Sequence, residues 1–557
     1  MTRRIIAGIG FFAAALVVVL IFIVGILFIA PGTNFFGATA VTGRQTFTTY
    51  LASEIPGVRD LLFSRNIMIE SNYIPIEVNV SKSRQLDELS IQVWENSTGL
   101  SFNSIQRTHV EWTQVLVQRD GNPRREMFYK VKVVEPSGMV NRRDDVIVIN
   151  LPSTDAAEAT RSGYNFILNT GRSSVTFTAD DGAPVQAYPL NIGTLEIMNA
   201  SGTVTVPANH SDITNVVVDS RAAKLSCRSP ISSDVLIMCD VGDFTFGDIG
   251  GYVAVEGKTN SAGGVNQVVV AGQSGVGGNV TLRGASVIFE QTHRDGAVGG
   301  DIYFRAERGL LSVARSGHIF MRTTSANLTG ISATPTSTSD RMIRSIDFVS
   351  IGDSTVNVAQ VGNVTSNLGN DKLAVKNVRG SITLRRVWVD TDVESEEGAI
   401  TVAFDAAIVP GTSGMPRIKI RAYDGAVTAT NIVGETDIFV RVNGRATVNA
   451  HFRQVRNGRI EYEGSTRRNR NIGNIDVRLY RNIPYCIVEI VNTRGAHNRT
   501  NPSMLTTMQH AAVANGAQLV NGASYHVRYA SRIEDQASTG NLRIDTSNTF
   551  NLHTSSS

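Results

Sequence analysis

A short pattern that begins with glycine and recurs along the chain is the feature that most constrains the fold. Between Gly299 and Thr323 the chain reads GGDIYFRAERGLLSVARSGHIFMRT, in which Gly300, Gly309 and Gly317 each precede a run of alternating apolar residues. Similar units begin at Gly193, Gly202, Gly278, Gly380, Gly398, Gly425, Gly444, Gly458, Gly473 and Gly540. The alternation predicts strands that bury one face, and the glycines predict tight turns between them.

The shortness of these units limits how the strands can be stacked. A unit of about nine residues holds one strand and one turn, and it has no room for a helix. Because one unit cannot bury its apolar face alone, we expect two or three strands to form a coil and successive coils to stack about 4.8 Å apart. The predicted fold class is therefore all-β, a parallel β-helix or solenoid. The alternative is a series of tandem β-sandwich domains, with Asp424-Gly425 and Asn443-Gly444 as hairpin turns.

The segment from Ile5 to Ala30 differs from the rest because it contains no charged residue and is apolar on every face. Its length is sufficient to cross a bilayer core of about 30 Å. Arg3 and Arg4 precede it, so the positive-inside rule predicts a cytoplasmic N-terminus and an extracytoplasmic bulk. The alternative is a cleaved signal peptide, whose apolar core would be unusually long. The sequence thus predicts a single-pass membrane protein with residues 5–30 in the bilayer.

The predicted segments follow from these changes in character along the chain. They are a transmembrane anchor (1–30), a juxtamembrane stalk (31–65), a β-rich N-terminal region or cap (66–190), glycine-punctuated repeats (191–500), and a final part with a helical or looped insertion, the last strands and a polar tail (501–557).

The charge balance bears on possible partners. The chain has 52 Lys and Arg against 49 Asp and Glu, a net charge of +3. Nucleic-acid-binding proteins usually concentrate basic residues, so no nucleic-acid partner is predicted. The exposed strands at the ends of a solenoid can pair with another copy, which makes a homo-oligomer or another surface molecule the expected partner.

The three cysteines allow two interpretations. Cys227 and Cys239 flank a turn-like stretch and could form a disulfide. The alternative is a pair of buried thiols, because cysteine is among the most buried residue types. Cys486 has no His or Asp beside it in the sequence, so it is not predicted to be a nucleophile.

The densest acidic stretch is VDTDVESEE. In an extended strand, alternate side chains share a face, which here groups Asp390, Asp392, Glu394 and Glu396. Oxygen ligands of this kind suit Ca²⁺, although the EF-hand pattern fails at Ser395 and Thr401. The alternative is a solvated acidic loop. No other metal or cofactor is predicted, because the nine histidines show no zinc-binding spacing.

An enzyme is the competing interpretation of a β-helix. Three short fragments are similar to parts of the polygalacturonase signature and occur in the same order: Asp180-Asp181, Gly317-His318 and Arg417-Ile418-Lys419. The Asn-Thr-Asp element is missing, however, and no second glycine follows His318. The sequence therefore predicts no catalytic residues.

Two longer stretches resemble a known family. The family is that of the adhesin β-solenoid domains of membrane-anchored bacterial envelope proteins. Its first coils are similar to the stretch SRNIMIESNYIPIEVNVSKSRQLDELSIQVWE. Its closing strands are similar to the stretch GNIDVRLYRNIPYCIVEIVNTRGAHNRTN. The resemblance covers most of Ile67 to Leu552 and implies a right-handed parallel β-helix with a surface-binding or structural role. The chain departs from it by long insertions. The predicted function is a membrane-anchored cell-surface solenoid that is not an enzyme; the alternatives are a polysaccharide-active enzyme and an envelope-sensing accessory protein.

Overall fold

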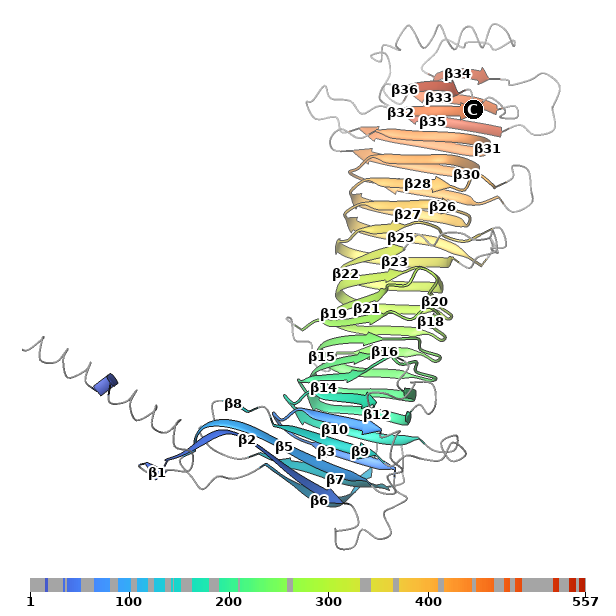
Figure 1. Ribbon diagram of the computed structural model, residues 1–557. Helices are drawn as coiled ribbons and strands as arrows, with labels where there is room; N and C mark the ends of the chain where they lie inside the picture. The colour runs from blue at the N-terminus through green and yellow to red at the C-terminus, as the bar shows by residue number, and fades with distance from the viewer. Residues whose placement is uncertain are drawn as a thin grey trace, which may run out of the picture. The chain divides into compact units, whose positions relative to one another are not determined.

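The computed structural model is all-β in the part that it describes, which confirms the predicted class at this level (Figure 1). The described residues are 16–18, 34–35, 38–51, 65–80, 89–101, 108–118, 125–135, 142–143, 145–151, 163–179, 190–208, 211–257, 264–330, 342–363, 370–408, 415–442, 447–464, 475–480, 486–492, 524–529, 540–546 and 550–555.

The predicted transmembrane segment lies almost entirely outside these residues. Leu16, Val17 and Val18 are described, and they are helical and exposed. Among the described residues, no helix has both the length and the apolar character needed to span a bilayer. The predicted helical insertion near 501–522 also lies outside the described residues.

The chain divides into two compact units, Met1–Phe246 and Gly247–Ser557. The strands of the first unit are β1 (Asn34–Phe35), β2 (Ala38–Leu51), β3 (Asn66–Glu70), β4 (Ile76–Val80), β5 (Ser90–Ser101), β6 (His109–Gln118), β7 (Arg125–Val134), β8 (Arg142–Arg143), β9 (Val146–Leu151), β10 (Tyr164–Gly171), β11 (Val175–Ala179), β12 (Leu190–Ala200), β13 (Thr203–Val206), β14 (Ser211–Cys227) and β15 (Val235–Phe246).

The first unit begins with antiparallel strands. β2 pairs with β5, β5 with β9, and β6 with β7, all antiparallel. Within residues 31–65, where the sequence predicts a stalk, β2 pairs with β5 from Thr39↔Ser101 to Leu51↔Ser90. The stretch QTFTTYL within β2 explains why a strand forms here, because it is rich in β-branched and aromatic residues that favour strands.

The remainder of the first unit is a set of parallel ladders. β3, β10, β12, β14 and β15 pair in parallel, each with the next. Their register aligns one fully buried residue from each strand, namely Ile69, Leu168, Ile197, Val218 and Ile237. The alternation predicted from the sequence therefore places apolar side chains in a continuous column.

The second unit contains the strands drawn from green to red in Figure 1. They are β16 (Val253–Glu256), β17 (Asn266–Val270), β18 (Gly275–Val276), β19 (Val280–Gln291), β20 (Ala297–Val298), β21 (Ile302–Val313), β22 (Ser316–Gly330), β23 (Ile343–Asp353), β24 (Val356–Val358), β25 (Lys372–Arg379), β26 (Ile382–Val387), β27 (Asp390–Glu397), β28 (Ile400–Phe404), β29 (Arg417–Ala422), β30 (Val427–Val442), β31 (Val448–Gly464), β32 (Ile475–Tyr480), β33 (Cys486–Asn492), β34 (Ser524–Tyr529), β35 (Gly540–Thr546) and β36 (Phe550–Ser555).

Parallel pairing also dominates the second unit, and its register extends over many strands. The exception among the described pairings is β33 with β34, which is antiparallel. One row of aligned, buried side chains runs through Val255, Leu282, Phe304, Met321, Phe348, Val375, Val393, Ile420, Ile438 and Ile460. Each strand therefore buries its apolar face against the strands before and after it.

The structure explains why a glycine stands at the turn that begins several of the repeated units. Gly380, Gly398 and Gly425 begin three successive units and lie one upon the next. A Cβ atom on Gly398 would lie 2.1 Å from the carbonyl oxygen of Gly380, and one on Gly425 would lie 1.9 Å from that of Gly398. The backbone at Gly398 also has a φ of 138°, which disfavours residues with a side chain. Close approach between turns thus explains the recurrent glycine.

The two cysteines of the first unit form no disulfide. Cys227 and Cys239 are free and buried. The parallel register of β14 and β15 places Ser220 opposite Cys239 and Phe246 opposite Cys227, so the cysteines occupy different positions along the ladder. The disulfide interpretation therefore gives way to that of two buried thiols, because the stretch between them does not fold as a hairpin.

We expect iodoacetamide to leave Cys227 and Cys239 unmodified in the folded protein and to label both after denaturation without reductant. Burial raises the pKa of Cys227 from its ordinary 9.0 to about 12, so the reactive thiolate is nearly absent at neutral pH. The Cys227 thiol keeps its proton to higher pH in the folded state than in the unfolded state. Its contribution to the stability of the fold is therefore lost as the pH rises from about 9 to about 12. Peptide mass spectrometry measures the labelling, and a requirement for reductant before the denatured chain reacts would contradict the structure.

Candidate binding site

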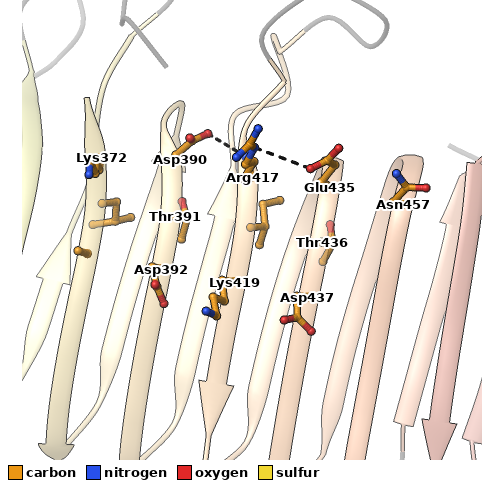
Figure 2. Close-up of a pocket in the computed structure, with 13 residues that line it drawn as sticks. Lys372, Asp390, Thr391, Asp392, Arg417, Lys419, Glu435, Thr436, Asp437 and Asn457 are labelled. Atoms are coloured by element: carbon orange, nitrogen blue, oxygen red, sulfur yellow. Dashed lines mark hydrogen bonds and ion pairs between the residues drawn. The ribbon is translucent and has the colours of Figure 1, made fainter. Parts of the chain in front are cut away.

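A shallow groove of 590 Å³ crosses the outer face of the second unit over β25, β27, β29, β30 and β31. Figure 2 shows its polar side chains projecting from neighbouring strands in rows. The charged and polar lining residues are Lys372, Asp390, Thr391, Asp392, Arg417, Lys419, Glu435, Thr436, Asp437 and Asn457. Three cations and four carboxylates therefore share one surface.

The strand pattern of β27 sets which of its side chains reach the groove. Thr391, Val393 and Ser395 are buried, whereas Asp392 and Glu396 are exposed and Asp390 and Glu394 are half-buried. The predicted shared face of the alternate carboxylates is therefore confirmed. The inward Thr391 and Ser395 belong to the same face as the apolar column, and the Thr391 hydroxyl donates to the carbonyl of Val389 at 3.0 Å.

The parallel register brings opposite charges together across the strands. Directly paired positions are Lys372↔Asp390, Asp392↔Lys419, Lys419↔Asp437, Arg417↔Glu435, Lys376↔Glu394 and Glu394↔Arg421. Opposite charges at paired positions stabilise neighbouring strands, and like charges there would destabilise them. The groove is therefore a surface of alternating sign rather than a patch of one charge.

Several of these pairs are in direct contact. Arg417 Nε lies 3.8 Å from Glu435 Oε2, and the backbone N–H of Arg417 donates to Asp390 Oδ1 at 2.8 Å (Figure 2). Arg421 lies 3.6 Å from Asp392 and 3.5 Å from Glu394. Lys376 lies 3.3 Å from the other oxygen of Glu394. Asp390, Asp392 and Glu394 are thus held by cations and an N–H group from the strands on either side of β27.

These contacts bear on the Ca²⁺ site predicted at Asp390, Asp392, Glu394 and Glu396, which stays a prediction beside that of a solvated acidic loop. Over the residues that the structure describes, no three His, Cys, Asp or Glu side chains are grouped so as to hold a metal ion. The mutual repulsion that a metal would relieve is instead offset by Lys376 and Arg421. Sequence reasoning missed these partners because they lie on other strands.

One carboxyl group of the groove has a perturbed acidity. Burial is the main reason that the pKa of Asp392 is raised, and the charge of Arg421 opposes this effect. The carboxylates of Glu394 and Asp437 raise the pKa of Asp392 further. Asp392 therefore keeps its proton to higher pH than an ordinary aspartate, which is a property of general acids.

The polygalacturonase-like fragments do not meet at one point. Asp180-Asp181 lies outside the described residues. His318 is on β22 and Arg417 is on β29, and β23, β25 and β27 lie between them, which implies a separation on the order of 19 Å. The backbone N–H of His318 donates to Asp301 Oδ1 at 2.8 Å, and its ring bonds to the hydroxyl of Ser345.

Comparison with known proteins identifies no family. No family model and no curated protein matches the sequence. Among solved structures, the chain is similar to a putative cell adhesion protein from Clostridium sporogenes, with 8% sequence identity over 57% of this chain and 98% of the other. The TM-score is 0.15, and a likeness this weak carries no argument about fold or function.

Proposed function

We propose that the chain is a membrane-anchored β-solenoid exposed at the cell surface, where it has a structural or adhesive role. The observation that carries this proposal is the aligned, buried column from Val255 to Ile460, formed by strands paired in parallel. Such stacking makes a stiff body whose outward side chains are free to bind. It also supports the solenoid over tandem sandwiches, which would require antiparallel neighbours.

The proposed anchor is the uncharged segment from Ile5 to Ala30. Its length and the preceding Arg3 and Arg4 support insertion with the N-terminus in the cytoplasm. The outward residues of the second unit, which include the charged groove, would then face the surroundings of the cell. Self-association through strand edges is part of the same proposal, because unpaired edges can accept another copy.

Membrane fractionation and protease treatment of intact cells test this proposal. We expect the full chain to stay with the membrane after alkaline extraction and to be cleaved by protease added outside the cells. A variant that lacks residues 5–30 should leave the membrane fraction, because the apolar segment supplies the anchoring energy. A full chain found in the soluble cytoplasm and protected from protease would refute the proposal.

A second candidate function is cleavage of an acidic polysaccharide in the groove. It is favoured by the raised pKa of Asp392 and by Asp437 two strands away, at a Cα separation on the order of 10 Å. Inverting glycosidases hold an acid and a base about 6.5–9.5 Å apart, so side chains on these strands are compatible with that arrangement.

The enzymatic candidate is tested by incubating the full chain with polygalacturonate and measuring new reducing ends. Catalysis in the groove predicts product formation that is lost in both Asp392→Asn and Asp437→Asn. The variant Asp243→Asn, which changes an exposed aspartate of the first unit, is the matched control. An absence of product with the unmodified chain would leave the structural or adhesive role as the proposed function.

A further inference from the structure

Three arginines occupy directly paired positions on the outer face of the second unit. Arg283 on β19 pairs with Arg305 on β21, and Arg305 pairs with Arg322 on β22. All three side chains are exposed. Neighbouring strands are about 4.8 Å apart, so the three arginines follow one another along one line at a regular interval. The guanidinium group of Arg322 also donates to the backbone carbonyls of Met321 and Asp347, at 3.1 and 2.9 Å.

This row departs from the alternation of charge in the groove. Like charges at paired positions destabilise a sheet, whereas the groove pairs cations with carboxylates. Three carboxylates border the row: Glu256 is paired in register with Arg283, Asp347 Oδ2 lies 2.6 Å from Arg322, and the exposed Glu307 follows Arg305 by two positions on β21. Arg305 has an arginine on each side, and among the described residues no carboxylate forms an ion pair with it. An external anion would therefore relieve the repulsion at Arg305.

Two aromatic residues lie beside the arginines on the same face. Tyr303 and Phe320 precede Arg305 and Arg322 by two positions on their strands. Their rings stack on each other with centroids 5.2 Å apart and planes at 9°, and Tyr303 is 43% exposed. The stack leaves the tyrosine hydroxyl at an exposed position, where it can exchange hydrogen bonds with a polar ligand.

We propose that this arginine row, formed by Arg283, Arg305 and Arg322 with Tyr303 beside them, binds an acidic polysaccharide. The proposal rests on the surface role argued above and specifies its ligand class. Guanidinium groups bind carboxylates and sulfates through paired N–H donors, and a line of them matches a polymer with repeated negative charges. Several weak contacts on one chain combine into a much stronger attachment. The tyrosine hydroxyl adds a partner for the sugar hydroxyls.

A single-stranded nucleic acid is the other polyanion that arginines and aromatic residues bind. Its bases stack on open aromatic faces. Here the facing surfaces of Tyr303 and Phe320 already cover each other. The chain also has a net charge of only +3, which gives little long-range attraction for a nucleic acid. The acidic polysaccharide is therefore the ligand that the surface favours.

The test is binding of the detergent-solubilised full chain to polygalacturonate, dextran sulfate, uncharged dextran and a single-stranded DNA oligonucleotide. The unmodified chain should bind at least one of the two acidic polysaccharides and not dextran, with affinity that falls as salt is raised. Arg305→Glu should weaken that binding at least tenfold. Its thermal midpoint should be unchanged or higher, because the substitution removes a like-charge contact.

Arg459→Glu is the matched control, since Arg459 is also an exposed arginine of the second unit but lies 2.9 Å from Glu461. This control should change polysaccharide binding less than twofold. The inference is overturned if neither acidic polysaccharide binds, if Arg305→Glu and Arg459→Glu behave alike, or if the oligonucleotide binds more tightly than both polysaccharides. Each of these failures leaves the surface location intact, because protease accessibility is measured independently of ligand binding.

Discussion

Replacing Gly398 by alanine is expected to lower the free energy of unfolding by about 3 kcal/mol. A left-handed backbone conformation costs a residue with a side chain about 1–2 kcal/mol, and φ at Gly398 is 138°. The new Cβ would in addition lie 2.1 Å from the carbonyl oxygen of Gly380, so one turn must move away from the next. Because this contact involves backbone, a change of side-chain rotamer cannot relieve it.

Urea denaturation followed by circular dichroism measures this loss. Gly193→Ala is the control, because Gly193 heads a similar unit but its Cβ would meet the side-chain oxygen of Asn165 at 2.8 Å. That side chain can turn aside, so the expected cost is below about 1 kcal/mol. Equal stability losses in the two variants would show that close approach between turns is not why glycine recurs.

The repeated pattern predicted which side chains of each strand point inward, but it did not predict which strands pair with one another. Alternation of apolar and polar residues identifies which side chains point inward, as the burial of Thr391, Val393 and Ser395 shows. Pairing depends on the lengths of the connections, which vary along the chain. Lys376 and Glu394 are 18 residues apart and paired, whereas Glu394 and Arg421 are paired at a separation of 27. Both separations are multiples of the nine-residue unit, so the period alone does not tell whether a strand pairs with the strand two units or three units further along the chain.

This variation explains why the sequence did not reveal which residues meet at the candidate sites. The acidic stretch of β27 was visible as a sequence cluster, but the cations that hold it come from β25 and β29. The line of Arg283, Arg305 and Arg322 is spread over β19, β21 and β22 and is invisible as a cluster in the sequence. The choice at Cys227 and Cys239 was open for the same reason, because their separation in sequence does not show that β14 and β15 pair in parallel.

The aligned column leads to a second large expected effect, at Phe348 on β23. Its ring is fully buried, and its strand pairs on one side with β22 at Met321 and on the other with β25 at Val375. Phe348→Ala is expected to lower the free energy of unfolding by about 3–5 kcal/mol, since it removes buried apolar area and leaves a cavity. Phe348→Leu should cost less, roughly 1–1.5 kcal/mol, because it fills most of that volume.

The position of the cavity within the column matters as much as its size. In a stack of strands, each layer is stabilised mainly by its two neighbours, so a cavity at Phe348 weakens the contacts toward both Met321 and Val375. Urea denaturation measures the loss, with Ile351→Ala as the control on the same strand. Ile351 is 68% exposed, so its truncation should change stability by no more than about 0.5 kcal/mol. If Phe348→Ala were as mild as Ile351→Ala, the column would not be the core that holds the strands together, and the stiff body on which the surface role depends would lose its physical basis.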